Sequence, residues 1–466
     1  METNKPLNRI VFVGFGTVAN SLLPLISRVC DLSRIEIYAL DPVIPKGASI
    51  FDYNIIFLKC RITKRNARVR LSKLLDAGSF LINLSTGVSS LELIKICRER
   101  GALYIDAGIE PWDGWYTDTS VPPSSRTNYC LRESLLKIKK KLGIGPTAVV
   151  AHGANPGLIS HFLKRALTNL GQEIFPESSL PKNREEWAKL SMMLKIKAIH
   201  IAEYDSQRSF TPRVKDEFTN TWSVDGFLSE AQQPAELGWG THEIALPNLG
   251  RRHKSGGKSS IYIIKPGAAI RVKTWTPYNG PCLGFLITHN ESISISDYLT
   301  YVADGRTYRP TVYYAYRPCD EAVISLHEWL GNDCREPGRK RILRPDDVFS
   351  GADYLGVLVM GDMRRTYWYG SVLTIDQAKS LAPLNTATTL QVAAGVLSGF
   401  MWALNNPRLG IVEPEEMDFE QVLSYALPYL GEMKGVYSSW SPLENNSGLF
   451  ETPESYNVWG FYNFLV

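Results

Sequence analysis

Short apolar runs alternate with stretches of helical periodicity through the first third of the chain. Six of these runs predict buried strands, at 9–14, 36–41, 54–60, 80–85, 103–107 and 148–153. Apolar positions at helical spacing predict helices between them, at 17–30, 69–75, 89–100 and 131–142. Strands that alternate with helices in this way are typical of one doubly wound, parallel α/β sheet.

Beyond residue 170 the pattern changes to long segments rich in Tyr, Trp, Ile and Val. These segments predict a mostly antiparallel sheet in an α+β domain, with strands within 194–203, 261–275, 283–295 and 311–316. From residue 386 the pattern is helical again, at 386–404 and 418–430. We therefore predict three units, at 1–153, 154–384 and 385–466, and the helices of the last are candidates to pack back on the first.

Composition narrows the function classes. A length of 466 residues exceeds what one hydrophobic core supports, and a hydrophobic fraction of 44% is ordinary for a soluble protein. The net charge of +4 is too small and too dispersed to predict a nucleic-acid surface. The helix predicted at 386–404 is interrupted by Gln391, Gly395 and Ser398, so we expect a buried core helix and no membrane span.

Cysteine usage and the start of the chain predict a cytoplasmic protein. Seven cysteines are scattered without C-x-x-C spacing, which is typical of reduced thiols. The first residues are polar and lead directly into a predicted strand, so no secretory signal is expected.

A glycine-rich fingerprint follows the first predicted strand. Gly14, Gly16 and Ala19 form a G-x-G-x-x-A motif, and Thr17 and Val18 lie in the first turn of the next helix. Gly14 permits a tight turn, Gly16 lets the backbone approach a pyrophosphate, and Ala19 allows close helix packing. The amides at the helix N-terminus favour bound phosphate. The motif therefore predicts a dinucleotide cofactor on a Rossmann domain.

An acidic residue at the end of the second predicted strand indicates which dinucleotide binds. Asp41 follows Ala19 by about 20 residues, the spacing at which an acid binds the adenosine ribose hydroxyls. A carboxylate there repels a 2′-phosphate, so we predict NAD; Lys46, a few residues on, keeps NADP open as the alternative. A turn initiated by Asp41 and the following proline is the minority interpretation.

Polar residues also follow the fourth and fifth predicted strands. Ser85 and Thr86 end the fourth, and Asp106, Ala107 and Glu110 end the fifth. The carboxyl ends of these strands should lie beside the nicotinamide half of the cofactor, so these residues are candidate contacts. Each is equally well explained as an ordinary loop or cap residue.

Two later segments carry candidate substrate chemistry. Asn155 is predicted to cap a helix that has Pro156 at its first position, and a well-capped helix is the plain interpretation of that segment. The segment 220–243 interleaves aromatic residues with acids, among them Trp222 and Glu230. Rings and carboxylates together suit an organic cation, although buried tryptophans and solvated acids explain the same pattern.

Together these motifs resemble the bacterial homospermidine synthases, which are related in fold to saccharopine dehydrogenase. The resemblance covers most of the chain, from the glycine fingerprint through 152–157 and 222–243 to 385–392, and its middle motifs are specific. It implies that Asn155 lies in the active site, that Trp222 holds the substrate cation over its ring, and that Glu230 binds an amino group. It also implies active-site positions for Glu203, His289, Glu291 and, by a weaker match, Asp353.

The resemblance implies a transferase of aminobutyl groups. Such an enzyme joins two putrescines, or spermidine and putrescine, into homospermidine, and NAD is a recycling carrier without net oxidation. The carbon that bears one amine is oxidised, ammonia leaves as a second amine adds, and the resulting imine is reduced again. Glu203, Glu230 and His289 are the candidate bases. The resemblance further implies a homodimer, with the α+β domain inserted into the Rossmann domain.

Two alternatives stay open. A carboxynorspermidine or saccharopine-type dehydrogenase binds carboxylate substrates and should present arginines, which the stretch from Trp222 to Glu243 lacks. A non-catalytic NAD-sensing protein keeps the cofactor site without turnover. The seven histidines include no H-x-x-x-H pair, so we expect no metal site, and neither a G-x-S-x-G nor a P-loop motif occurs.

Overall fold

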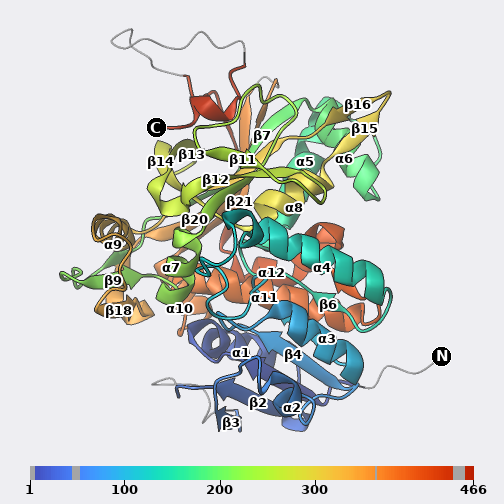
Figure 1. Ribbon diagram of the computed structural model, residues 1–466, viewed down its shortest axis with the longest axis vertical. Helices are drawn as coiled ribbons and strands as arrows, with labels where there is room; N and C mark the ends of the chain where they lie inside the picture. Colours follow the sequence, from blue (N-terminus) through green and yellow to red (C-terminus); the bar gives the residue numbers. More distant parts are fainter. Residues whose placement is uncertain (1–5, 45–52, 363–364, 444–456) are drawn as a thin grey trace.

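The computed structural model describes residues 6–44, 53–362, 365–443 and 457–466, and two large sheets organise it (Figure 1). The first sheet has seven strands in the order β22-β6-β5-β4-β1-β2-β3, and every neighbouring pair is parallel. Its strands are β1 (Arg9–Val13), β2 (Glu36–Asp41), β3 (Ile56–Lys59), β4 (Ser79–Asn83), β5 (Leu103–Asp106), β6 (Ala148–Val149) and β22 (Ile411–Val412).

Helices cover both faces of this sheet because its central strands are apolar on both sides. Ile10 and Phe12 pack toward one face, with α1 and α11, while Val11 and Val13 pack toward the other, with α2, α3 and α4. These helices are α1 (Thr17–Val29), α2 (Ala67–Leu71), α3 (Ser90–Arg100), α4 (Asn128–Leu142) and α11 (Ala387–Asn405). The doubly wound fold predicted from the sequence is confirmed.

The second sheet has ten strands and is mostly antiparallel. Its main path is β11-β12-β10-β17-β7-β20-β21-β23, the hairpin β13-β14 extends from β17, and β17 with β7 is its parallel pair. The strands are β7 (Ile196–Asp205), β10 (Pro234–Gly238), β11 (Gly250–Arg252), β12 (Ser260–Pro266), β13 (Arg271–Thr276), β14 (Gly280–Ile287), β17 (Thr311–Arg317), β20 (Ala352–Gly361), β21 (Thr366–Thr374) and β23 (Glu432–Ser438).

Seven further α-helices, several short 3-10 helices and three small sheets complete the described structure. The helices are α5 (Leu158–Ile174), α6 (Arg184–Met193), α7 (Val224–Gln232), α8 (Asn290–Tyr298), α9 (Asp320–Gly331), α10 (Ile375–Leu381) and α12 (Phe419–Ala426). The small sheets pair β8 (Arg208–Ser209) with β19 (Val348–Ser350), β9 (Glu217–Asn220) with β18 (Arg339–Ile342), and β15 (Tyr301–Ala303) with β16 (Arg306–Tyr308).

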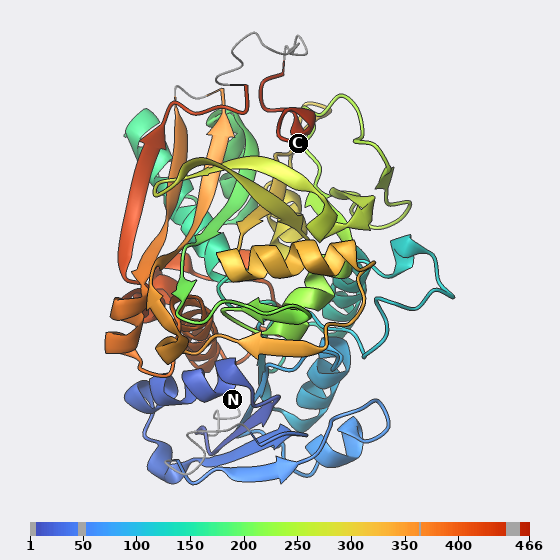
Figure 2. The same cartoon turned by 90° about the vertical axis from the view of Figure 1, so that its left-hand side faces the viewer.

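The C-terminal segment divides between the two domains. Helix α11 packs on α1, and β22 joins the edge of the parallel sheet, as the predicted return to the first domain requires. Strand β23, however, pairs with β21, and Figure 2 shows it in red at the edge of the second sheet. The tail packs there too, because Phe461 and Phe464 belong to that sheet's core. The described part of the segment 385–466 from β23 onward therefore packs with the second domain.

Helix α11 is long and apolar enough to cross a membrane by length and composition alone. In the structure 83% of its apolar window is buried inside the protein. It packs against α1, α12 and β5, which is the position of a core helix that connects the two domains (Figure 1).

Candidate active site

The glycine fingerprint forms the turn between β1 and α1 at the carboxyl edge of the parallel sheet. Gly14 has φ 82°, and a Cβ there would lie 2.7 Å from the backbone nitrogen of Ser85, so only glycine fits. Gly16 precedes the first residue of α1, and a Cβ there would meet no protein atom within 4 Å. The protein's own packing does not demand this second glycine, whereas close approach of a pyrophosphate to the helix N-terminus does.

Asp41 lies beside this turn. Its Oδ2 accepts a hydrogen bond from the backbone nitrogen of Phe15 at 2.8 Å, and its Oδ1 accepts one from Val43 at 2.8 Å. The carboxylate is therefore held against the glycine-rich turn, and its contact with an adenosine ribose stays a prediction. Lys46, the residue that kept NADP open, lies outside the described residues.

The candidate contacts after β4 and β5 are used in different ways. Ser85 donates from Oγ to Asn83 at 2.7 Å, and Thr86 is exposed at the same edge. Asp106 is fully buried, and its carboxylate accepts hydrogen bonds from the Tyr104 hydroxyl at 2.7 Å and from the Ala151 amide at 2.6 Å. Its carboxylate thus points into the protein and ties β5 to the end of β6. Burial raises its pKa to about 6.

Residues 107–110 connect the cofactor edge to the second domain. Ala107 is half-buried directly after β5, and the backbone nitrogen of Ile109 donates to the side chain of Asn290 at 3.4 Å. Glu110 accepts from the backbone of Gly87 at 3.3 Å, and burial raises its pKa to about 8. The N-terminus of α8 therefore lies against the edge where the nicotinamide half is expected.

The sequence predicted that Asn155 caps the following helix, and the structure shows that it does not. Helix α5 begins at Leu158 with Gly157 before it, and the amide of Leu158 donates to the carbonyl of Gly153 at 3.0 Å. Because the backbone of this tight loop satisfies the helix start, the Asn155 side chain is directed elsewhere. Its Nδ2 donates to Oε2 of Glu203 on β7 at 2.5 Å.

Glu203 lies near the end of β7 at the centre of the site. It is 3% exposed, and its Oε2 also accepts a hydrogen bond from the Tyr314 hydroxyl at 2.5 Å. Burial raises the pKa of Glu203 to about 7 even though these hydrogen bonds oppose the shift. A carboxyl group that titrates near neutral pH suits both the uptake and the release of a proton.

His289, directly before α8, is held between two carboxylates. Its Nε2 lies 3.1 Å from Oε2 of Glu230, and its Nδ1 lies 3.3 Å from Oε1 of Glu291. Burial alone would lower the pKa of His289, but Glu230 and Glu291 raise it to about 10. The two carboxylates thus favour the protonated, imidazolium form of the ring.

An aromatic wall connects Trp222 to His289. Nε1 of Trp222 donates to the hydroxyl of Tyr316 at 3.2 Å, and Tyr316 stacks on Tyr314 with ring centroids 5.1 Å apart. The Tyr314 ring in turn lies 4.3 Å from the ring of His289. Tyr314 and Tyr316 share one face because they alternate along β17. The wall presents several ring faces beside the carboxylates, which is the environment that an organic cation requires.

A second group of acids lies behind Glu203. Asp353 on β20 is opposite Asp205 on β7, and both are buried. Asp353 accepts from the hydroxyl of Thr388 at 2.5 Å, and Asp205 accepts from that of Thr221 at 2.7 Å. Burial and the neighbouring carboxyls of Glu203 and Asp205 raise the pKa of Asp353.

The acid-rich segment at 220–243 divides in the structure. Trp222 and Glu230 lie at the site, whereas Trp239 is buried in the core of the second sheet. Glu236 accepts hydrogen bonds from two amides in the first turn of α4, and Glu243 accepts from the amide of Phe461. Trp239, Glu236 and Glu243 thus contact other parts of the protein and lie outside the candidate active site. Within the described ranges, no group of three or more His, Cys, Asp or Glu could hold a metal ion.

Family models place the fold and this site in one class of proteins. Residues 10–149 match the Saccharopine dehydrogenase NADP binding domain, and residues 153–437 match the Saccharopine dehydrogenase C-terminal domain. The chain is thus a saccharopine-dehydrogenase-like protein. A yeast saccharopine dehydrogenase (L-Glu forming, Saccharomyces cerevisiae) shares the fold at a TM-score of 0.50 and 11% identity, covering 92% of this chain and 100% of the yeast chain.

Full-length relatives narrow the class to one family. Homospermidine synthase from Blastochloris viridis is 46% identical over 98% of this chain and 97% of its own length, and that from Mesorhizobium japonicum is 44% identical over 98% and 96%. The crystal structure of homospermidine synthase from Legionella pneumophila in complex with NAD has a TM-score of 0.91 and 43% identity, covering 98% of both chains. The chain belongs to the homospermidine synthase family.

Proposed function

We propose that the chain is a homospermidine synthase that uses NAD to join two putrescines, or putrescine and the aminobutyl group of spermidine. The observation that carries this proposal is that an aromatic wall from Trp222 to Tyr314 lies beside the buried carboxyl group of Glu203. Diamines carry an ammonium at each end, and the relatives named for this reaction match almost the whole chain.

The cofactor contacts are part of the proposal. The turn from Gly14 to Ala19 leaves the start of α1 open to phosphate, with the amides of Thr17 and Val18 in its first turn. Asp41 would accept hydrogen bonds from the adenosine ribose and would repel a 2′-phosphate, which favours NAD over NADP. Ser85, Thr86 and Ala107 would line the nicotinamide half of the cofactor. Asp106, whose carboxylate points inward, would support this region by accepting a hydrogen bond from the Ala151 amide.

Substrate binding follows from charge and ring geometry. An ammonium over the Trp222 ring gains about 0.5 to 2 kcal/mol, depending on its desolvation. Glu230 and Glu291 would hold an ammonium end, since His289 balances only one of their two charges. Among the described contacts of Glu203, Glu230 and Asp353, none is with a lysine or arginine. A site with acids and without such basic contacts disfavours the carboxylate substrates that the dehydrogenase alternative requires.

Glu203 has the position and the pKa for proton transfer. Bound NAD accepts and later returns the hydrogen and electron pair of the substrate carbon that bears the amine. Glu203 would take the proton of the reacting ammonium and give one to the ammonia that leaves when the second amine adds, while Asn155 and Tyr314 orient its carboxylate. The balance is two putrescines converted into one homospermidine and one ammonia.

Product analysis tests this proposal. Purified protein is incubated with putrescine and NAD, the amines are identified by mass spectrometry, and absorbance reports reduced cofactor. We expect homospermidine and ammonia without accumulation of NADH, and we expect Glu203→Gln to lower kcat by about 100-fold or more because proton transfer is lost. Steady NADH formation would support a dehydrogenase instead. Bound NAD without any turnover would support the sensing role.

We further propose a cytoplasmic homodimer. All seven cysteines are free, which is consistent with a reducing compartment. The dimer is carried over from the family resemblance. Light scattering after size exclusion tests it, since a monomer has a mass of 52.2 kDa and a dimer has twice that mass.

A further inference from the structure

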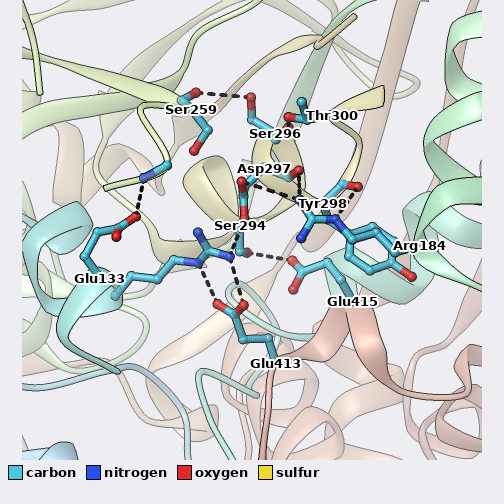
Figure 3. Close-up of polar contacts among 12 residues, drawn as sticks. Glu133, Arg184, Ser259, Ser294, Ser296, Asp297, Tyr298, Thr300, Glu413 and Glu415 are labelled. Atoms are coloured by element: carbon cyan, nitrogen blue, oxygen red, sulfur yellow. Dashed lines mark hydrogen bonds and ion pairs between the residues drawn. The ribbon is translucent and has the colours of Figure 1, made fainter. Parts of the chain in front are cut away.

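A cavity outside the candidate active site lies between the two domains. It has a volume of about 590 Å³, within the range of small-molecule sites, and is walled by α4, α5, α6, α8, the start of α12 and the short helix η6 (Pro414–Glu416). None of the residues placed in the candidate active site lines it. Figure 3 shows part of its wall, where side chains of α8 face the acids that follow β22.

The cavity lining carries more acids than bases. The four basic side chains are outnumbered by six acids, which are Asp297, Glu413, Glu415, Glu416, Asp418 and Glu420. Four of these acids already form salt bridges, and Asp418 caps α12. Glu415 forms no salt bridge among the described residues, and its printed side-chain partners are two serine hydroxyls.

The buried basic groups of the cavity are already satisfied. Arg132 binds Glu413 at 2.6 Å and Asp297 at 3.1 Å. Lys164 donates to the carbonyl of Met417 at 3.0 Å, and its ammonium also lies over the rings of Trp187 and Tyr298. An anionic ligand at Arg132 would therefore have to compete with two carboxylates, whereas a cationic ligand would leave both salt bridges in place.

One carboxylate oxygen of Glu415 has no hydrogen-bond donor among the described residues. The residue is 4% exposed, and its Oε1 accepts hydrogen bonds from the hydroxyls of Ser160 at 2.9 Å and Ser294 at 2.6 Å. Oε2 has no hydrogen-bond partner within the described ranges. A buried carboxylate oxygen without a donor costs free energy that a bound ammonium would recover.

We propose that this cavity binds a linear organic cation with a primary ammonium end, a diamine or polyamine, through Glu415. This site is separate from the site of the proposed reaction, and a ligand bound there would act as an effector. Two helices connect it to the active site, since Ser160 lies on α5, just after the loop of Asn155, and Ser294 lies on α8, just after His289. An ammonium on Glu415 would thus influence α5, which follows the Asn155 loop, and α8, which follows His289 and carries Glu291.

Calorimetric titration with 1,4-diaminobutane tests the site. The titration uses NAD-loaded protein with Glu203→Gln in all samples, so that no turnover interferes. We expect Glu415→Gln to lower the number of diamines bound per chain by one. The matched control is Glu420→Gln, at the rim of the same cavity, which should keep the full number. An unchanged number in Glu415→Gln, or an equal loss in both variants, would overturn the proposal.

A second pair of variants keeps the test valid if Glu415→Gln does not fold. Lys182 and Lys189 are both exposed, and only Lys182 lines the cavity. We expect Lys182→Glu to tighten binding of the diamine at least threefold, because it adds an acid to the rim, and Lys189→Glu to leave it unchanged. Equal effects of the two substitutions would contradict a site here. Because binding alone is counted, this result is independent of the proposed synthase activity.

Discussion

One hydrogen bond fixes the indole of Trp222, from its Nε1 to the hydroxyl of Tyr316 at 3.2 Å. We predict that Tyr316→Phe raises KM for putrescine about fivefold and changes kcat little, because about 1 kcal/mol of orientation is lost while the proton-transfer groups remain. Tyr313→Phe is the matched control, since Tyr313 lies on the opposite face of β17 and its hydroxyl has no partner among the described residues. Equal KM values for both variants would contradict the orienting role.

The sequence predicted which polar residues gather at the site better than it predicted what each one does. Glu203, His289 and Glu291 lie together in the structure as the family motifs imply. Tyr314 and Asp205 were missed, because a tyrosine or an acid in a buried strand shows its direction only through the residues that alternate with it. Tyr314 is two positions before Tyr316, and Asp205 is two positions after Glu203, so both directions follow once the strands are known.

The turn between β1 and α1 provides a test at the level of an element. We predict that Gly16→Ala weakens NAD binding about tenfold, or about 1.4 kcal/mol, without loss of thermal stability, because the added methyl meets cofactor and no protein atom. Gly14→Ala should instead lower Tm, since its Cβ would clash with the backbone at Ser85. Titration with NAD and thermal melts of both variants check this. Unchanged NAD affinity in Gly16→Ala would contradict the assigned pyrophosphate position.

Elements with a full period were predictable from sequence, whereas short ones were predicted less well. Strand β2 has the predicted bounds Glu36–Asp41, and α3 differs from its prediction by one residue. Strand β22 contains two residues, too few to show alternation, and only its pairing with β6 identifies it. The start of α5 moved to Leu158 because backbone carbonyls satisfy its first amides, which residue preferences do not reveal.

At the scale of the whole molecule, buried carboxyls make stability depend on pH. The pKa is raised to about 7 in Glu203 and Glu415 and to about 8 in Glu236, in each case mainly by burial. Unfolded carboxyls lose their protons near pH 4 to 4.5. At intermediate pH the folded protein therefore binds more protons, so these groups stabilise it at low pH and that contribution is lost as pH rises through 7 to 8.

We predict that Tm falls as pH rises from about 6.5 to about 8.5. His289 contributes in the same direction, because its pKa is raised to about 10 and the unfolded imidazole loses its proton near 6.5. Glu236→Gln should flatten the decline near pH 8, because Glu236 lies outside the active site and titrates there. Thermal melts across this pH range check the slope. A Tm that rises steadily with pH would contradict the raised pKa values of these buried acids.

The connection of the domains was only partly readable from the sequence. The apolar periodicity of 386–404 predicted a core helix that returns to the first domain, and α11 is that helix. The same segment then supplies β23 to the second sheet, because its alternating residues match the exposed edge of β21. The sheet that an edge strand joins is decided by the strand it pairs with, here β21. The sequence of the edge strand alone does not specify that partner.

Deuterium tracing tests the central claim, that substrate oxidation and imine reduction share one NAD in one site. Putrescine deuterated on both amine-bearing carbons is incubated with the protein, NAD and an excess of unlabelled NADH. The account predicts homospermidine that retains every deuterium, because the hydrogen removed from the donor carbon returns to that carbon. A product one deuterium short would show that the removed hydrogen exchanges with free cofactor, and it would contradict internal recycling.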